Sequence, residues 1–200
     1  MCPPVAKFEY ACFISYKHPP KAAPDDHFYR EYVKSLKSML ERYLVTEIRT
    51  FLDENADPGT AYPIHLPQSL CKSVCMIAVL TPEYPDSKWC TAEWQAMEGL
   101  EAKRLGNGQK GLIIPIVAQG NVRELENIFK RKALDLKVAL ASQLRNAKKA
   151  AQIQELARQI AKFVKQLPDP CENCAGFTFE LGSEETTYPP KYKDPDPFAS

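Results

Sequence analysis

The sequence predicts an α/β protein whose five-stranded parallel sheet is covered by helices on both faces. Segments 74–81 and 111–119 are continuously apolar, which is typical of strands buried on both faces. Segments 88–104 and 142–167 repeat their apolar residues every three or four positions, as one face of a helix requires. Strand-like and helical segments alternate along the chain, and this alternation favours parallel strands joined by helices.

The first half of the chain contributes two strands and two helices. Residues 10–16, "YACFISY", form a short aromatic and apolar run that indicates a buried strand. Helical spacing of apolar residues extends over 25–44, with Asp25 or Asp26 available to cap the helix. The other elements expected in this half are an alternating strand at 45–53, a loop rich in turn residues at 54–63 and a short helix at 64–73.

The second half continues the alternation and ends in the clearest helix. Pro115 lies inside the strand 111–119 and argues against a fully central position for it, because proline cannot donate to a strand ladder. The expected elements in order are a strand at 74–81, a helix at 88–104, a strand at 111–119, a helix at 122–129, a weak strand at 133–138 and a helix at 142–167.

Composition indicates a soluble globular protein and excludes some functional classes. The formal net charge is +1, so no overall field attracts nucleic acid or a membrane surface. No apolar run approaches the ~20 residues of a membrane span, and the N-terminal residues lack a signal-peptide core. Five of the seven cysteines lie in or near apolar segments, so we expect reduced, buried thiols in the cytoplasm rather than a disulfide framework.

The composition changes at Pro168, which divides the chain into a domain (1–167) and a tail (168–200). The tail holds six prolines and has a net charge of −5, whereas residues 123–165 have a net charge of +7. This pattern is typical of a loosely ordered acidic tail beside a solvated basic helix face. The alternatives are a tail that folds back onto the basic face, or a basic face that contacts a nucleotide or a partner.

A glutamate interrupts the apolar face of the helix at 88–104. On a helical wheel, Glu93 falls within the arc that contains Trp89, Trp94 and Met97, one turn after Trp89. Ligands of a doubly wound sheet bind beyond the carboxyl ends of its strands. Lys17, which follows the first strand, is therefore expected to converge with Trp89 and Glu93, and this trio suits a ligand with phosphate, ring and sugar parts.

Three motifs together resemble a Toll/interleukin receptor (TIR) domain over residues 8–165. They are "FISYKH" at the end of the first strand, "FLDENADPGTAY" after the second and "VLTPEYPDSKWCTAEW" after the third. The third is similar to the Ser-x-Trp-Cys-x-x-Glu pattern of plant immune and bacterial defence TIR domains. The resemblance implies a flavodoxin-like fold, with Glu93 as the catalytic residue for NAD cleavage and Trp89 lining the nicotinamide pocket.

The resemblance also implies the remaining substrate-binding residues. Tyr16, Lys17 and His18 stand where catalytic relatives often have Tyr-Arg-Arg, so this sequence departs from a double arginine. Asp57 and Gly59 belong to "DPG", which is similar to the Pro-Gly of the family's mobile loop. Asp53 precedes that loop and is expected either to contact the ligand or to order the loop backbone.

The function that the resemblance implies is that of an NAD glycohydrolase. Its products are nicotinamide and either ADP-ribose or a cyclised form, and its setting is immune or antiviral defence in the cytoplasm. NAD is the substrate, and no separate cofactor is implied. The implied partners are other copies of the domain, through TIR–TIR contacts, and another TIR-containing or sensor protein. The alternative is a non-catalytic module that assembles a signalling complex.

Each candidate residue also has a structural interpretation. Glu93 could lie on the helix surface with its stem against Trp89, Trp94 could be a plain core aromatic, and Lys17 could be a solvated loop residue. The three histidines share no metal-ligand spacing, and "CENC" at 171–174 is half of a zinc or redox signature without a second pair. We therefore expect no metal site.

Overall fold

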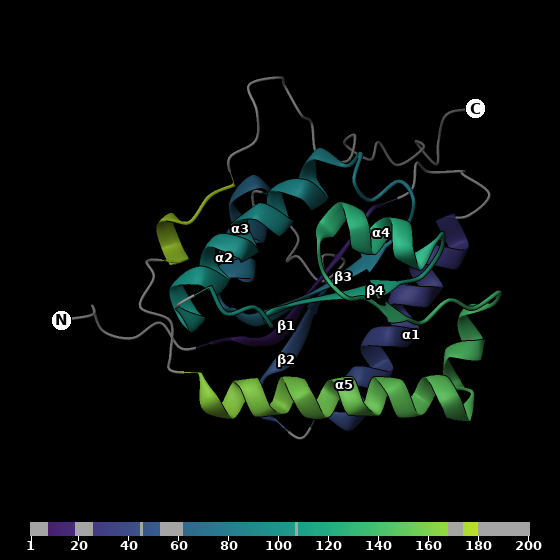
Figure 1. The fold of residues 1–200 in the computed structure, drawn as a ribbon. Coiled ribbons are helices and arrows are strands. Elements are labelled where there is room, and N and C mark those ends of the chain that lie inside the picture. Colours follow the sequence, from purple (N-terminus) through teal and green to yellow (C-terminus); the bar gives the residue numbers. More distant parts are fainter. Residues whose placement is uncertain are drawn as a thin grey trace, which may run out of the picture.

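The predicted strands form one parallel sheet. The computed structural model describes residues 8–18, 26–44, 46–52, 62–106, 108–167 and 174–179. Its strands are β1 (Tyr10–Tyr16), β2 (Arg49–Leu52), β3 (Ser73–Leu80), β4 (Ile113–Val117) and β5 (Leu134–Asp135). They pair in the order β2-β1-β3-β4-β5, all parallel (Figure 1). The fold class is confirmed, and the strand order reverses between β1 and β3.

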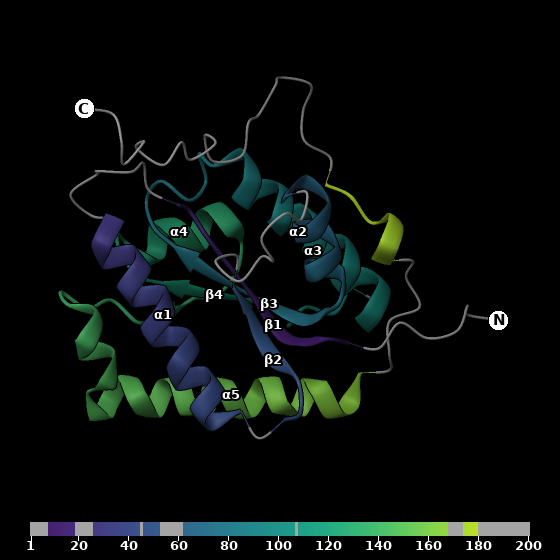
Figure 2. The same cartoon turned by 180° about the vertical axis from the view of Figure 1, so that it is seen from behind.

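Helices cover both faces of this sheet. They are α1 (Asp26–Tyr43), α2 (Tyr62–Cys71), α3 (Lys88–Leu105), α4 (Val122–Phe129) and α5 (Ala147–Gln166). Helices α1 and α5 pack together on one face, and α2 and α3 pack together on the other (Figures 1 and 2). None of the helices that the structure describes is long and apolar enough to cross a membrane.

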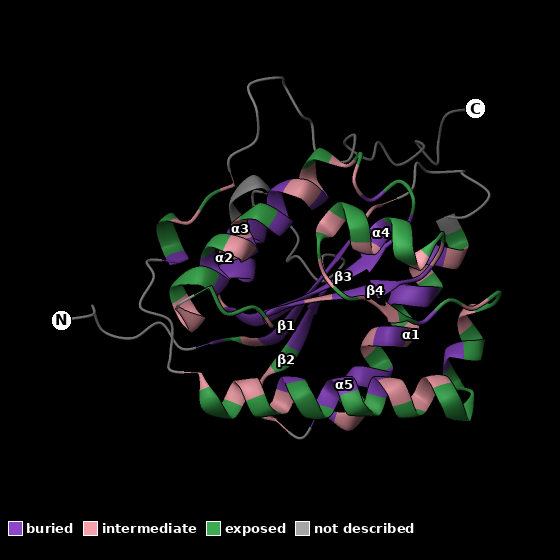
Figure 3. Cartoon of the chain, in the orientation of Figure 1, coloured by how far each residue is buried: buried purple, intermediate pink, exposed green. Residues whose placement is uncertain are grey.

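The core lies between the sheet and these helices. Every residue of β3, "SVCMIAVL", is buried, as its continuous apolar sequence predicts (Figure 3). Pro115 is tolerated in β4 for a geometric reason. The Leu112 carbonyl accepts from Met76 and the Ala118 N–H donates to Leu80, so even-numbered residues of this segment bond to β3. Pro115 therefore turns its nitrogen toward β5, where pairing begins only at Ile116.

Several boundaries differ from those predicted. Strand β2 is confined to Arg49–Leu52, and β5 to two residues. The helix expected over 142–167 is divided into a 3₁₀ turn (Ala141–Arg145) and α5. Asn146 separates them because its backbone is extended and its side chain accepts from the amide of Lys149, which makes it the N-cap of α5. Periodicity alone does not reveal such an internal cap.

The cysteine prediction is partly wrong. Cys12, Cys75 and Cys90 are free and buried as expected, but Cys71 and Cys174 form a disulfide across 103 positions of sequence. Cys71 is the last residue of α2, and the 3₁₀ turn Cys174–Gly176 contacts that helix. The described turn of the tail thus contacts α2, and the predicted loose order of the tail as a whole stays a prediction.

Candidate functional site

Helix α3 holds the predicted catalytic residue at the reversal of strand order. Ser87 begins the helix as its N-cap by accepting a hydrogen bond from the amide of Cys90 at 3.3 Å. Trp89 and Glu93 lie one turn apart near this start of the helix. Glu93 is only 5% exposed, so the interpretation of it as a helix-surface residue is wrong.

The carboxyl group of Glu93 belongs to a buried hydrogen-bond chain. Ser15 Oγ, near the end of β1, donates to Glu93 Oε2 at 2.5 Å. Ser15 Oγ also lies 2.6 Å from the hydroxyl of Tyr84, in the loop after β3. Because a serine has one hydroxyl proton and Ser15 gives it to Glu93, the Tyr84 hydroxyl must be the donor to Ser15.

The surroundings keep Tyr84 in its donor form. Burial raises the pKa of Tyr84 well above its ordinary value, and the neighbouring Cys90 and Glu93 raise it further. Tyr84 is completely buried, and its ring packs edge-on against Phe129 at 5.6 Å. Tyr84 and Ser15 thus hold the Glu93 side chain in one orientation. The sequence analysis assigned no role to Ser15 or Tyr84. The sequence feature that could have indicated Tyr84 is its position as an aromatic residue in an otherwise polar loop.

The residues after Ser15 carry the predicted substrate contacts. Tyr16 is the last residue of β1 and is 6% exposed, and its ring lies 4.2 Å from that of His18. Lys17 and His18 are half-buried. Burial raises the pKa of the Cys90 thiol, Glu93 raises it further and Lys17 opposes the rise. Lys17 and Glu93 therefore both lie within electrostatic reach of Cys90.

The two tryptophans of α3 have different environments. Trp94 is 6% exposed and packs on Phe129 at 4.3 Å and beneath the Arg131 guanidinium at 5.6 Å, as a core aromatic is expected to do. Trp89 is half-buried, and the ring of Phe179 from the tail lies edge-on to it at 6.1 Å. Trp89 is thus the tryptophan that a ligand or another segment can reach.

Three of the predicted site residues cannot be placed relative to Glu93. Asp53, Asp57 and Gly59 lie outside the described residues, in the segment between β2 and α2. Their roles stay predictions from the sequence.

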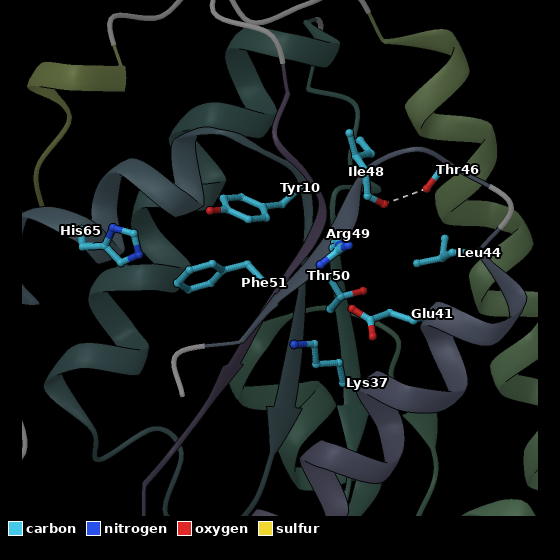
Figure 4. A pocket seen from close by; sticks show the side chains of 10 residues that line it. All are labelled: Tyr10, Lys37, Glu41, Leu44, Thr46, Ile48, Arg49, Thr50, Phe51 and His65. Atoms are coloured by element: carbon cyan, nitrogen blue, oxygen red, sulfur yellow. Dashed lines mark hydrogen bonds between the residues drawn. The ribbon is translucent and has the colours of Figure 1, made fainter. Parts of the chain in front are cut away.

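A cavity of about 680 Å³ lies elsewhere, around the edge strand β2. Figure 4 shows Tyr10, Phe51 and His65 on one side of this strand and Lys37 and Glu41 on the other. None of the predicted site residues that the structure describes lines this cavity.

Comparison with known proteins decides the family. A model of the TIR domain family matches residues 12–159. The chain belongs to the TIR domain family. The match includes Ser15, Tyr84, Trp89 and Glu93 and ends within α5. Residues 174–179, which pack on α2, are not part of it.

Solved structures include a similar TIR domain. The TIR domain of the Toll-related receptor TRR-2 from Hydra magnipapillata is 21% identical, with a TM-score of 0.46, over 76% of this chain and 98% of that one. No curated protein matches this TIR domain. The family as a whole acts in signal transduction: its members include signalling adaptors and NAD-cleaving enzymes, and TIR domains typically self-associate through TIR–TIR contacts.

Proposed function

We propose that this TIR domain is an NAD glycohydrolase that cleaves the bond between nicotinamide and ribose. The observation that carries the proposal is the buried Glu93 carboxyl group, oriented by Ser15 and one helical turn from the half-buried Trp89. A buried carboxyl group is costly to the fold, and such groups gather at functional sites.

The reaction needs little beyond a fixed carboxylate. The nicotinamide of NAD is a cationic leaving group, so its departure needs no general acid. The ribose becomes positively charged as the bond breaks, and a carboxylate beside it stabilises that charge most effectively when it is already held in position. The hydrogen bond from Ser15 supplies this preorganisation.

The neighbouring residues have complementary roles in the proposal. Trp89 provides an aromatic face for the nicotinamide ring, Lys17 pairs with the diphosphate, and Tyr16 and His18 line the approach to the sugar. Water or a ring nitrogen of the substrate then attacks the ribose, giving ADP-ribose or a cyclised product. A role in cytoplasmic immune or antiviral defence belongs to the same proposal and rests on the sequence motifs.

One experiment tests the proposal directly. Purified protein is incubated with NAD at high concentration, alone and clustered on a support, and the products are separated by chromatography and identified by mass. We expect nicotinamide together with linear or cyclic ADP-ribose. Intact NAD under both conditions would favour the alternative, a TIR module that only assembles a signalling complex.

Lys17→Ala is expected to weaken substrate binding rather than to slow the chemical step. Loss of a partly screened charge pair with the diphosphate corresponds to about 1 kcal/mol, or a roughly fivefold rise in KM with little change in kcat. Initial rates over a range of NAD concentrations measure both constants. Lys103→Ala serves as the control, because it also removes one positive charge but lies in the last turn of α3. If both variants have the KM of the wild type, Lys17 does not contact the substrate.

Activity per molecule is expected to rise with protein concentration. Because TIR domains self-associate, a neighbouring copy can stabilise the substrate-binding arrangement of the site and shift a population that already exists. Initial rates from dilute to concentrated protein, with light scattering at each concentration, measure both quantities. Constant specific activity while the protein goes from monomer to oligomer would contradict this coupling.

A further inference from the structure

Residues 174–179, which we name the aromatic latch, are bonded to α2 at two points. Cys174 is joined to Cys71 by the disulfide, and the Ala175 carbonyl accepts a hydrogen bond from Gln68 Nε2 at 2.8 Å. The latch begins with a 3₁₀ turn, Cys174–Gly176, closed by a bond from the Phe177 amide to the Cys174 carbonyl at 3.3 Å. These anchors fix where the following residues can lie.

The C-terminal residues of the aromatic latch lie against α3. The Phe179 ring meets the Trp89 indole edge-on, with 6.1 Å between centroids and 73° between planes, an arrangement that aromatic pairs favour. Phe177 and Phe179 both pack, half-buried, against the core. The contact therefore involves the tryptophan to which the proposed function assigns the nicotinamide ring.

We propose that the aromatic latch is a competitor, built into the chain, for the ring-binding face of Trp89. The inference rests on the proposed function, because that function places nicotinamide, a flat ring like that of Phe179, against the same tryptophan. A single edge-on ring contact is weak by itself. The disulfide keeps Phe179 next to Trp89 at a high effective concentration, so the contact is populated without a large interface.

The same disulfide makes the competition sensitive to redox state. Reduction by a dithiol breaks the bond between the two sulfurs, leaves thiols at Cys71 and Cys174, and transfers two electrons and two protons from the dithiol, which becomes a disulfide. Cys71 is fully buried and Cys174 is 2% exposed, so the reductant reaches them only after the latch moves away from α2. Once the tether is cut, Phe179 leaves Trp89 more often and NAD competes more easily.

Phe179→Ala tests the competition, with Thr178→Ala as the control because Thr178 is exposed in the same segment. If the latch occupies the site for most of the time, Phe179→Ala lowers the KM for NAD about three- to tenfold at unchanged kcat. Cys174→Ser, or dithiothreitol added to the wild type, should have the same effect. Equal KM values for Phe179→Ala and Thr178→Ala would overturn the competition.

Tryptophan fluorescence separates a failure of this inference from a failure of the proposed function. Acrylamide should quench Trp89 at least about twofold more efficiently in Phe179→Ala or after reduction, and a Trp94→Phe background isolates that signal. If quenching rises but NAD neither binds nor is cleaved, the proposed function fails and the competition with it. Unchanged quenching, or a peptide map of the oxidised protein without a Cys71–Cys174 link, overturns the latch even if NAD is cleaved.

Discussion

Glu93→Gln is expected to reduce NAD cleavage at least about 10³-fold while leaving the domain folded. The substitution keeps the shape of the side chain and its ability to accept the hydrogen bond from Ser15. It removes the negative charge that stabilises the developing charge on the ribose. Because a buried carboxyl group costs stability and a neutral amide costs less, the melting temperature should stay the same or rise. Loss of activity without loss of stability identifies a residue retained for chemistry.

Glu98→Gln is the matched control, since Glu98 lies on the same helix with a side chain that is 42% exposed and that contacts Arg131 only at 3.4 Å, a contact that the neutral amide oxygen can keep. It should cleave NAD at the rate of the wild type. Product formation by chromatography and thermal unfolding are measured on all three proteins. Wild-type turnover in Glu93→Gln would exclude Glu93 as the catalytic residue and, with it, the mechanism proposed above.

The fold was predictable because its signals are local in sequence. The continuous apolar run of β3 and the helical spacing of α3 each follow from neighbouring residues, and so does the position of Glu93 in an apolar arc. The partners of Glu93 were not predictable in this way. Ser15 is 78 positions from Glu93 and 69 from Tyr84, so their hydrogen bonds exist only after β1, β3 and α3 are assembled.

The disulfide shows a second limit of sequence reasoning. Cys71 lies at the end of an apolar helix and resembles the buried free thiols of β1 and β3 in its local sequence. Its pairing with Cys174 depends on where the chain returns after α5, and no periodic pattern specifies that path. A count of seven cysteines cannot by itself separate a single bridge from none.

Sequence reasoning also missed the buried ion pair that holds the other end of α3. Glu101 is 2% exposed, and its carboxylate accepts from Arg131 Nη2 at 2.5 Å and from the amides of Gly111 and Leu112 at 2.6 and 2.7 Å. Burial alone would raise the pKa of Glu101, but the hydrogen bonds from Arg131 and from these two amides outweigh burial and lower it. Glu101 therefore joins the end of α3 to the start of β4 through the two amides, and to the segment between α4 and β5 through Arg131.

Arg131→Ala is accordingly expected to lower the free energy of unfolding by about 3–5 kcal/mol, because it leaves the Glu101 carboxylate buried without its countercharge. For a chain of this size, that loss corresponds to a fall of roughly 6–20 °C in melting temperature. Arg158→Ala is the matched control. It breaks the exposed pair with Glu155 and should cost less than about 1 kcal/mol. Denaturant unfolding of the three proteins measures these differences, and equal losses in the two variants would contradict the role given to the buried pair.

The pH dependence of stability gives an independent test of the same pair. The pKa of Glu101 is lower in the folded state than in the unfolded chain, where it is about 4.3. The stability that Glu101 contributes is therefore complete above the unfolded-state pKa and is lost as the pH falls through the folded-state pKa. Arg131→Ala should make this loss of stability in acid smaller, because the variant already lacks part of the Glu101 contribution at neutral pH.

The pair also fixes the helix that presents Glu93, so Arg131→Ala should reduce NAD cleavage even at temperatures where the domain remains folded.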